Sequence, residues 1–165
     1  MLDLARYYVD GALTLNEAYA RAYIARANIA YEQGELQKAQ TDYEHALTLI
    51  GVPDHAFIFE KAKLGLGNVY HNRLLSATES ARPALAEKAI GYFQEVIAAV
   101  NGLDPPRQPN RERAAWAHYG IGRINQMQQQ TPMARAAYQA TLQLTEDRAL
   151  RSDIEERLQT LEAQS

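Results

Sequence analysis

The strongest constraint on the fold is a short motif that recurs along the chain. Residues 12–15 read Ala-Leu-Thr-Leu, and residues 46–49 repeat these four residues 34 positions later. The same shift places Ala5 over Ala39. Self-similarity at a fixed period of roughly 20–50 residues indicates stacked copies of one supersecondary unit. The sequence therefore predicts a repeat architecture in which no single unit buries its own apolar face.

The clearest copy lies on both sides of Gly34. Small and aromatic residues recur there at helical spacing: Tyr23, Ala27 and Ala30 before the glycine, and Ala39, Tyr43 and Ala46 after it. Small residues let two antiparallel helices approach closely, and an aromatic ring fills the space between units. Glycine is the residue best suited to the turn between them. This copy predicts a helix–turn–helix unit.

A second copy has Gly67 on its first helix and Phe93 on its second. Gly67 and Ala89 are 22 positions apart, whereas Ala27 and Ala39 are 12 apart. We expect the inserted residues to lengthen both helices of this pair around a polar turn at 78–82. The insertion should then project as a helical hairpin beyond the edge of the repeats.

A third copy begins at Trp116, where Trp116, Tyr119 and Gly120 would be its aromatic, large and small positions. Ala134 and Tyr138 follow on its second helix, about two positions later than in the first copy. Thr131 and Pro132 read as an N-cap followed by a proline in the first turn.

The two ends and one linker complete the pattern. Residues 3–15 match only the second helix of a unit, and residues 152–155 read as a capping box for a closing helix. Residues 101–113 hold three prolines and are expected to form a loop. Its arginines, Arg107, Arg111 and Arg113, are either part of a solvated connector or an anion-binding edge.

These motifs resemble the tetratricopeptide repeat, a helix–turn–helix unit of 34 residues. The resemblance implies an all-α, right-handed α-solenoid of antiparallel helix pairs in a single domain, residues 1–165. Its parts would be a half repeat (3–15), a repeat (17–50), an extended repeat (54–101), a repeat (111–145) and a capping helix (148–163). About eight helices are expected, at 3–15, 17–33, 36–50, 54–77, 82–101, 111–128, 131–145 and 148–163.

Composition narrows the function classes. The formal charge of −3 argues against a nucleic-acid partner, which needs a basic face. There is no cysteine, which fits a cytoplasmic location, and no apolar stretch has the length of a membrane span. The four histidines lack the spacing of a zinc site, and the two Gly-x-Gly runs lie inside helices. We expect no metal, no cofactor and no catalytic residues, and thus not an enzyme.

In proteins of this family the first helices line a concave groove. By resemblance, its side chains here are Arg21, Ile24, Asn28, Glu32, Lys61, Leu64, Asn68, His71, Asn72, Ala117, His118 and Ile121. Asn28 and Asn68 stand where one branch of the family grips a peptide's terminal carboxylate. That branch also needs basic residues where Ile24 and His118 stand, so this specificity is not assigned.

Two functions remain open. One is a non-catalytic scaffold that binds a protein or peptide in the groove, where two cations would favour acidic segments. The other is a structural, oligomerising or regulatory module of a larger protein. The helix at 3–15 has an apolar face of Leu4, Tyr8, Ala12 and Leu15, and we expect self-association or domain contact through it.

Overall fold

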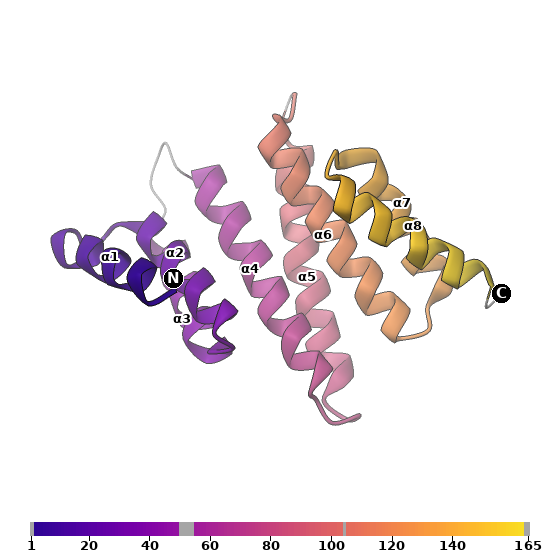
Figure 1. Cartoon of the computed structure of the whole chain (residues 1–165), viewed down its shortest axis with the longest axis horizontal. Coiled ribbons are helices and arrows are strands. Elements are labelled where there is room, and N and C mark those ends of the chain that lie inside the picture. The colour runs from indigo at the N-terminus through magenta and orange to yellow at the C-terminus, as the bar shows by residue number, and fades with distance from the viewer. Residues whose placement is uncertain (1, 50–54, 104, 164–165) are drawn as a thin grey trace.

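The structure is a computed structural model that describes residues 2–49, 55–103 and 105–163. The described residues form eight helices and no strand (Figure 1). The helices are α1 (Leu2–Leu15), α2 (Ala20–Glu32), α3 (Leu36–Thr48), α4 (His55–Leu75), α5 (Arg82–Asn101), α6 (Gln108–Met127), α7 (Thr131–Leu144) and α8 (Arg148–Ala163).

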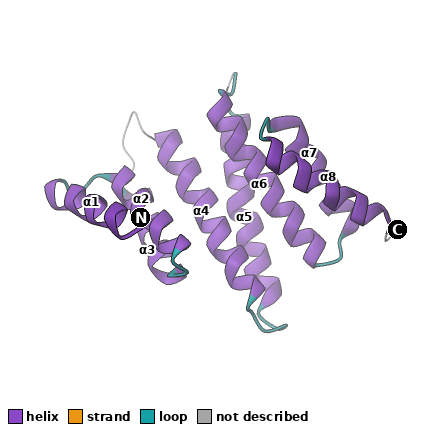
Figure 2. Ribbon diagram, in the orientation of Figure 1, coloured by secondary structure: helices purple, strands orange, loops and turns teal. Residues whose placement is uncertain are grey.

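Helices that follow one another in the chain pack side by side. The pairs α2–α3, α4–α5 and α6–α7 make the most extensive contacts, and α1 and α8 pack at the two ends (Figure 2). The first helix of each pair also contacts the next, α2 with α4 and α4 with α6. Because every unit packs mainly on its neighbours, the molecule is an all-α solenoid, as the repeat pattern predicted.

Most helix boundaries agree with the expected ones to within about three residues. The predicted ends at residues 50 and 54 lie outside the described residues. α2 begins at Ala20 and not at 17, because Asn16 Oδ1 accepts a hydrogen bond from the backbone N of Ala18 (3.0 Å) and holds a turn there. The loop predicted for 101–113 overlaps the helices predicted at 82–101 and 111–128, and it is wrong for residue 101, which ends α5, and for residues 108–113, which are the first turns of α6. Proline is tolerated in a first helical turn, where no amide donor is needed.

α7 and α8 begin at the predicted residues, 131 and 148, but the two predicted capping groups are wrong. Asp147, rather than the 152–155 box, caps α8, because its Oδ1 accepts hydrogen bonds from the backbone N of Ala149 (2.8 Å) and Leu150 (3.0 Å). The predicted box lies inside the helix. Thr131 is already helical, and Gln130 is the N-cap of α7 without a side-chain capping bond.

Aromatic rings on the second helices lie against glycines on the first helices, and the ring on α5 does so on both sides. The two edges of the fully buried Phe93 ring on α5 lie against Gly67 on α4 and Gly120 on α6. A Cβ at Gly120 would lie 2.5 Å from the Phe93 ring. Any larger residue would therefore force α5 and a first helix apart.

The same contact corrects the register of the third repeat. Tyr43 on α3 lies against Gly65, and Tyr138 on α7 lies against Gly122. The first glycine of each Gly-x-Gly run thus meets the ring of the preceding repeat, and the second glycine meets the ring of its own. Gly122, not Gly120, is the equivalent of Gly67, and it is 12 positions before Ala134. The third repeat has no extra residues in its turn.

The corrected register also identifies the left-handed residue of the third repeat. Gly34, with φ of 75°, ends α2, and the backbone N of Glu35 donates to Ala30 O (2.8 Å). Gln129, with φ of 58°, ends α6 in the same way, and Gln130 N donates to Asn125 O (2.9 Å). A glutamine therefore occupies a conformation that favours glycine.

The inserted residues lengthen the second repeat as expected. α4 has 21 residues and α5 has 20, whereas α2 and α3 have 13 each. In Figure 1 the α4–α5 turn reaches beyond the α2–α3 and α6–α7 turns. Leu74 is only 2% exposed and packs with Ala86 and Ala89. The base of this hairpin is thus part of the core.

Gly120→Ala should lower the free energy of unfolding by about 1–3 kcal/mol, because the buried Phe93 ring has no space to retreat. Gly91→Ala is the matched control, since a Cβ at Gly91 meets nothing within 4 Å. This control should raise stability by up to about 1 kcal/mol through helix propensity. Urea denaturation of the two variants measures both effects. Equal stability of the two variants would contradict the ring contact.

Gln129→Gly should raise the free energy of unfolding by about 0.5–1 kcal/mol, because glycine adopts the left-handed backbone conformation of this position without the steric strain of a side chain. Gln128→Gly is the control, since Gln128 has φ of −86° and gains nothing from glycine. Thermal denaturation of both variants tests this. A gain for Gln128→Gly that equals the gain for Gln129→Gly would show that backbone strain is not the cause.

Candidate functional site

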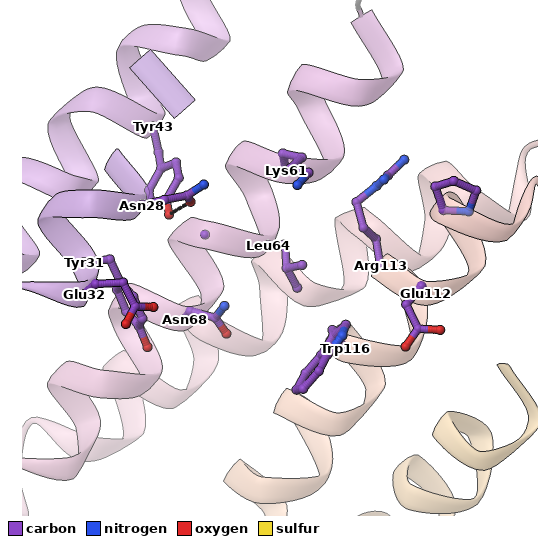
Figure 3. Close-up of a pocket in the computed structure, with 12 residues that line it drawn as sticks. Asn28, Tyr31, Glu32, Tyr43, Lys61, Leu64, Asn68, Glu112, Arg113 and Trp116 are labelled. Atoms are coloured by element: carbon purple, nitrogen blue, oxygen red, sulfur yellow. Dashed lines mark hydrogen bonds between the residues drawn. The ribbon is translucent and has the colours of Figure 1, made fainter. Parts of the chain in front are cut away.

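A pocket of about 450 Å³ lies across the three first helices (Figure 3). α2 forms one wall, α4 the floor and α6 the opposite wall. The described residues that line it are Asn28, Tyr31, Glu32, Tyr43, Lys61, Leu64, Gly65, Asn68, Pro109, Glu112, Arg113 and Trp116.

The repeat register explains which side chains reach the pocket. Asn28 directly follows Ala27, and Asn68 directly follows Gly67, so the two amides occupy equivalent places on α2 and α4. Lys61 and Trp116 each precede their small residue by six positions, which makes them equivalent on α4 and α6. Stacked repeats therefore place these side chains in rows across the first helices.

One hydrogen bond fixes the orientation of the first amide. The Tyr43 hydroxyl donates to Asn28 Oδ1 (2.6 Å), as the dashed line in Figure 3 shows. Burial raises the pKa of Tyr43, so the hydroxyl keeps its proton and remains a donor. Because the Asn28 oxygen accepts this bond, its NH₂ group is the part of the amide left to donate to a ligand.

A buried ionic cluster joins the floor of the pocket to its far wall. Glu60 on α4 is 0% exposed and pairs with Arg113 Nε on α6. Asn110 Nδ2 donates to both Glu60 oxygens, at 2.8 and 3.0 Å. Removing one partner of such a cluster leaves a buried group unpaired. The cluster holds α4 and α6 at a fixed separation beside the pocket.

The charges on the pocket walls are mixed. Lys61 Nζ lies 5.5 Å from the centre of the Phe57 ring, and Arg113 is engaged with Glu60. Glu112 accepts a hydrogen bond from the Thr145 hydroxyl (2.6 Å). Lys61 on the floor and Glu32 on the α2 wall thus offer a ligand one charge of each sign.

Four polar residues of the predicted groove line the pocket: Asn28, Glu32, Lys61 and Asn68. Arg21 lies over the Phe57 ring, 4.8 Å from its centre. Asn72 is hydrogen-bonded to the Tyr31 hydroxyl on the pocket wall. Leu64, which was also expected on this face, lines the pocket.

Other predicted residues lie deeper. Ile24 is 4% exposed and Ala117 is 0% exposed, so their expected place on the groove surface is wrong. His71 is 5% exposed, and its Nε2 has no hydrogen-bond partner among the residues that the structure describes. His118 is half-buried, and burial lowers its pKa.

Trp116 is the main residue that sequence reasoning placed wrongly. It was assigned to the aromatic position of the third repeat, which Tyr23 occupies in the first copy, but it is 40% exposed and lines the pocket. The register error of two residues caused this, and it also caused the misplacement of Ala117. The spacing of 12 positions between Gly122 and Ala134, equal to that in the first repeat, was the available signal. No sequence signal pointed to the Glu60 cluster.

The described residues contain no group of three or more histidine, aspartate or glutamate side chains placed to hold a metal ion. Among the described helices, none combines the length and apolarity needed to cross a membrane.

The fold and pocket together define a helical-repeat protein with a pocket across its first helices. Residues 20–50 match the family model of the tetratricopeptide repeat. With its eight described helices in consecutive contact, the chain fits a tetratricopeptide-repeat protein. A comparison with curated proteins gives no match. Tetratricopeptide repeats generally mediate protein–protein interaction.

Acidification should lower the free energy of unfolding, because His71 is buried in its neutral form. Burial, and to a smaller extent Arg123, lowers the pKa of His71 from 6.5 to about 4. Between these pH values the unfolded chain takes up the proton first, so stability is lost as pH falls through this window, by up to about 3 kcal/mol. His71→Gln should flatten the dependence of unfolding free energy on pH between 6.5 and 4. Parallel pH profiles for parent and variant would contradict this assignment.

Proposed function

We propose that the chain is a non-catalytic scaffold that holds an extended segment of another protein across α2, α4 and α6. The observation that carries this proposal is the pocket that spans all three first helices and contains two equivalent amides, Asn28 and Asn68. The general role of tetratricopeptide repeats in protein–protein interaction supports it.

The amides suit an extended backbone. A side-chain amide offers both donors and an acceptor, so it can bond peptide groups of any sequence. The Tyr43 hydroxyl donates a hydrogen bond to Asn28 Oδ1, so the NH₂ group of Asn28 is left to donate to a peptide carbonyl. Asn68 lies on α4 between Asn28 and the α6 wall (Figure 3). Two amides in one row can bond successive parts of one extended segment.

An apolar contact adds selectivity. The Trp116 indole is 40% exposed on the α6 wall, and Leu64 lies beside it on α4 (Figure 3). Tryptophan supplies a large share of binding energy at many protein interfaces. The proposed ligand therefore places an apolar side chain against Trp116, and an acidic side chain on Lys61 would add an ionic contact that weakens with salt.

A second function rests on a different observation. α1 exposes Leu4, Tyr8 and Leu15 at 60%, 67% and 91%. This face favours a structural role through contacts of the N-terminal helix. The two functions use different surfaces and are compatible in one molecule.

Trp116 provides a direct test, because it is the sole tryptophan of the chain. Peptides selected from a random display library on the immobilised chain should change the tryptophan emission when they are titrated into the parent. Trp116→Phe, Asn68→Ala and Lys61→Ala should each weaken binding of a selected peptide by about 1 kcal/mol or more. Calorimetry supplies the binding constants, including those of the variant without tryptophan.

Gln139→Ala is the control, since Gln139 is exposed on the second helix α7. It should bind as the parent does, and thermal denaturation should show all four variants folded. Peptides that bind the three pocket variants as tightly as the parent would exclude the pocket as the site.

A further inference from the structure

Two helical glycines, Gly11 and Gly91, are not required by any contact with the described residues of the chain. Gly65, Gly67, Gly120 and Gly122 each lie against an aromatic ring, whereas a Cβ at Gly11 on α1 or at Gly91 on α5 would meet nothing within 4 Å. Glycine within a helix costs about 1 kcal/mol relative to alanine. Gly11 is also the centre of an exposed apolar face.

That face is a regular stripe on the outer side of α1. Leu4, Tyr8, Gly11 and Leu15 are spaced by four, three and four positions, which is the core spacing of a coiled coil. A shallow hollow of about 630 Å³ is lined by α1 residues alone, including Tyr8, Gly11 and Leu15. None of the four stripe residues is charged.

The other side of α1 is already used for packing on this chain. Leu13 is 7% exposed, and the Arg6 guanidinium donates to Gln33 Oε1 on the α2–α3 turn (3.0 Å). Asp10 lies 3.7 Å from Arg26 of α2. These contacts fix the rotation of α1 and direct the stripe outward.

We propose that the stripe binds the same stripe of a second copy of this chain, in an antiparallel two-fold dimer of α1 helices. A two-fold axis between residues 9 and 10 pairs Leu4 with Leu15 of the other copy. It also pairs Tyr8 with Gly11 of the other copy. Each of these two pairs then occurs twice in the dimer, as a symmetric interface requires.

The pairing of Tyr8 with Gly11 of the other copy is the same kind of contact, an aromatic ring against a helical glycine, that joins the repeats within the chain. The Tyr8 ring lies against Gly11 of the partner as Phe93 lies against Gly120 within the chain. The two leucines cover the ends of the stripe. α1 has 14 residues. A contact of this length is short for a permanent interface, so we expect dissociation constants of roughly micromolar order.

Sedimentation velocity of the 165-residue chain over a range of concentrations measures the association. The parent should shift from monomer to dimer, and Tyr8→Glu should remain a monomer. Gly11→Ala should raise Tm by about 2–4 °C, because it improves helix propensity. The same change should weaken dimerisation by about tenfold, because it keeps the ring away from the backbone. Gly91→Ala is the matched control: it should raise Tm without changing the dissociation constant.

Cross-linking tests the register, and the chain has no cysteine of its own to interfere. In an oxidised mixture of Leu4→Cys and Leu15→Cys chains, the disulfide should join one variant to the other. Either variant alone should form little disulfide dimer. A cross-link between two Leu4→Cys chains would show a parallel contact and overturn the proposal.

Two other results would overturn it. One is a parent that sediments as a monomer up to about 1 mM, which would leave the face to a different protein or segment. The other is a dimer whose dissociation constant is unchanged by both Gly11→Ala and Tyr8→Glu. Neither result bears on peptide binding in the concave pocket, which uses other residues.

Discussion

The rest of this structure depends on aromatic rings that lie against helical glycines. Phe93 contacts Gly67 and Gly120, so one side chain sets the distance from α5 to both α4 and α6. Each glycine lowers helix propensity, and buried aromatic contact offsets that loss. A ring can lie this close to a helix only at a residue without a Cβ. The ring–glycine contacts therefore also fix the position of each helix along the axis of its neighbour. The rows of side chains on the concave face follow from that register.

The sequence predicted the helices well because small and aromatic residues recur at helical spacing on both sides of each turn. The predicted register of the third repeat was wrong, because Gly120 and Gly122 are two positions apart and either glycine could be the small residue of the repeat. The spacing of 12 positions from Gly122 to Ala134 favours Gly122, and the ring that each glycine meets, a tertiary contact, decides between them. Residues 108–113 were taken as a loop because Pro109 breaks most helices, although it is compatible with a first turn.

The pocket was predicted in part. Asn28, Lys61 and Asn68 were found because their places relative to the small residues repeat along the chain. The α6 wall was missed because the register error assigned Trp116 to the aromatic position of the repeat and not to the position equivalent to Lys61. The Glu60 cluster joins residues about 50 positions apart without a shared periodicity, so no local pattern could reveal it.

The Glu60 cluster affects which helices of the solenoid unfold together. In a solenoid, stability is the sum of the repeats and of the interfaces between neighbours. A buried ion pair between α4 and α6 strengthens one such interface, between the second and third repeats. These two repeats should therefore exchange their amide hydrogens as one cooperative block. α1, α2 and α3 lie outside that block, and their amides should exchange through openings of lower free energy.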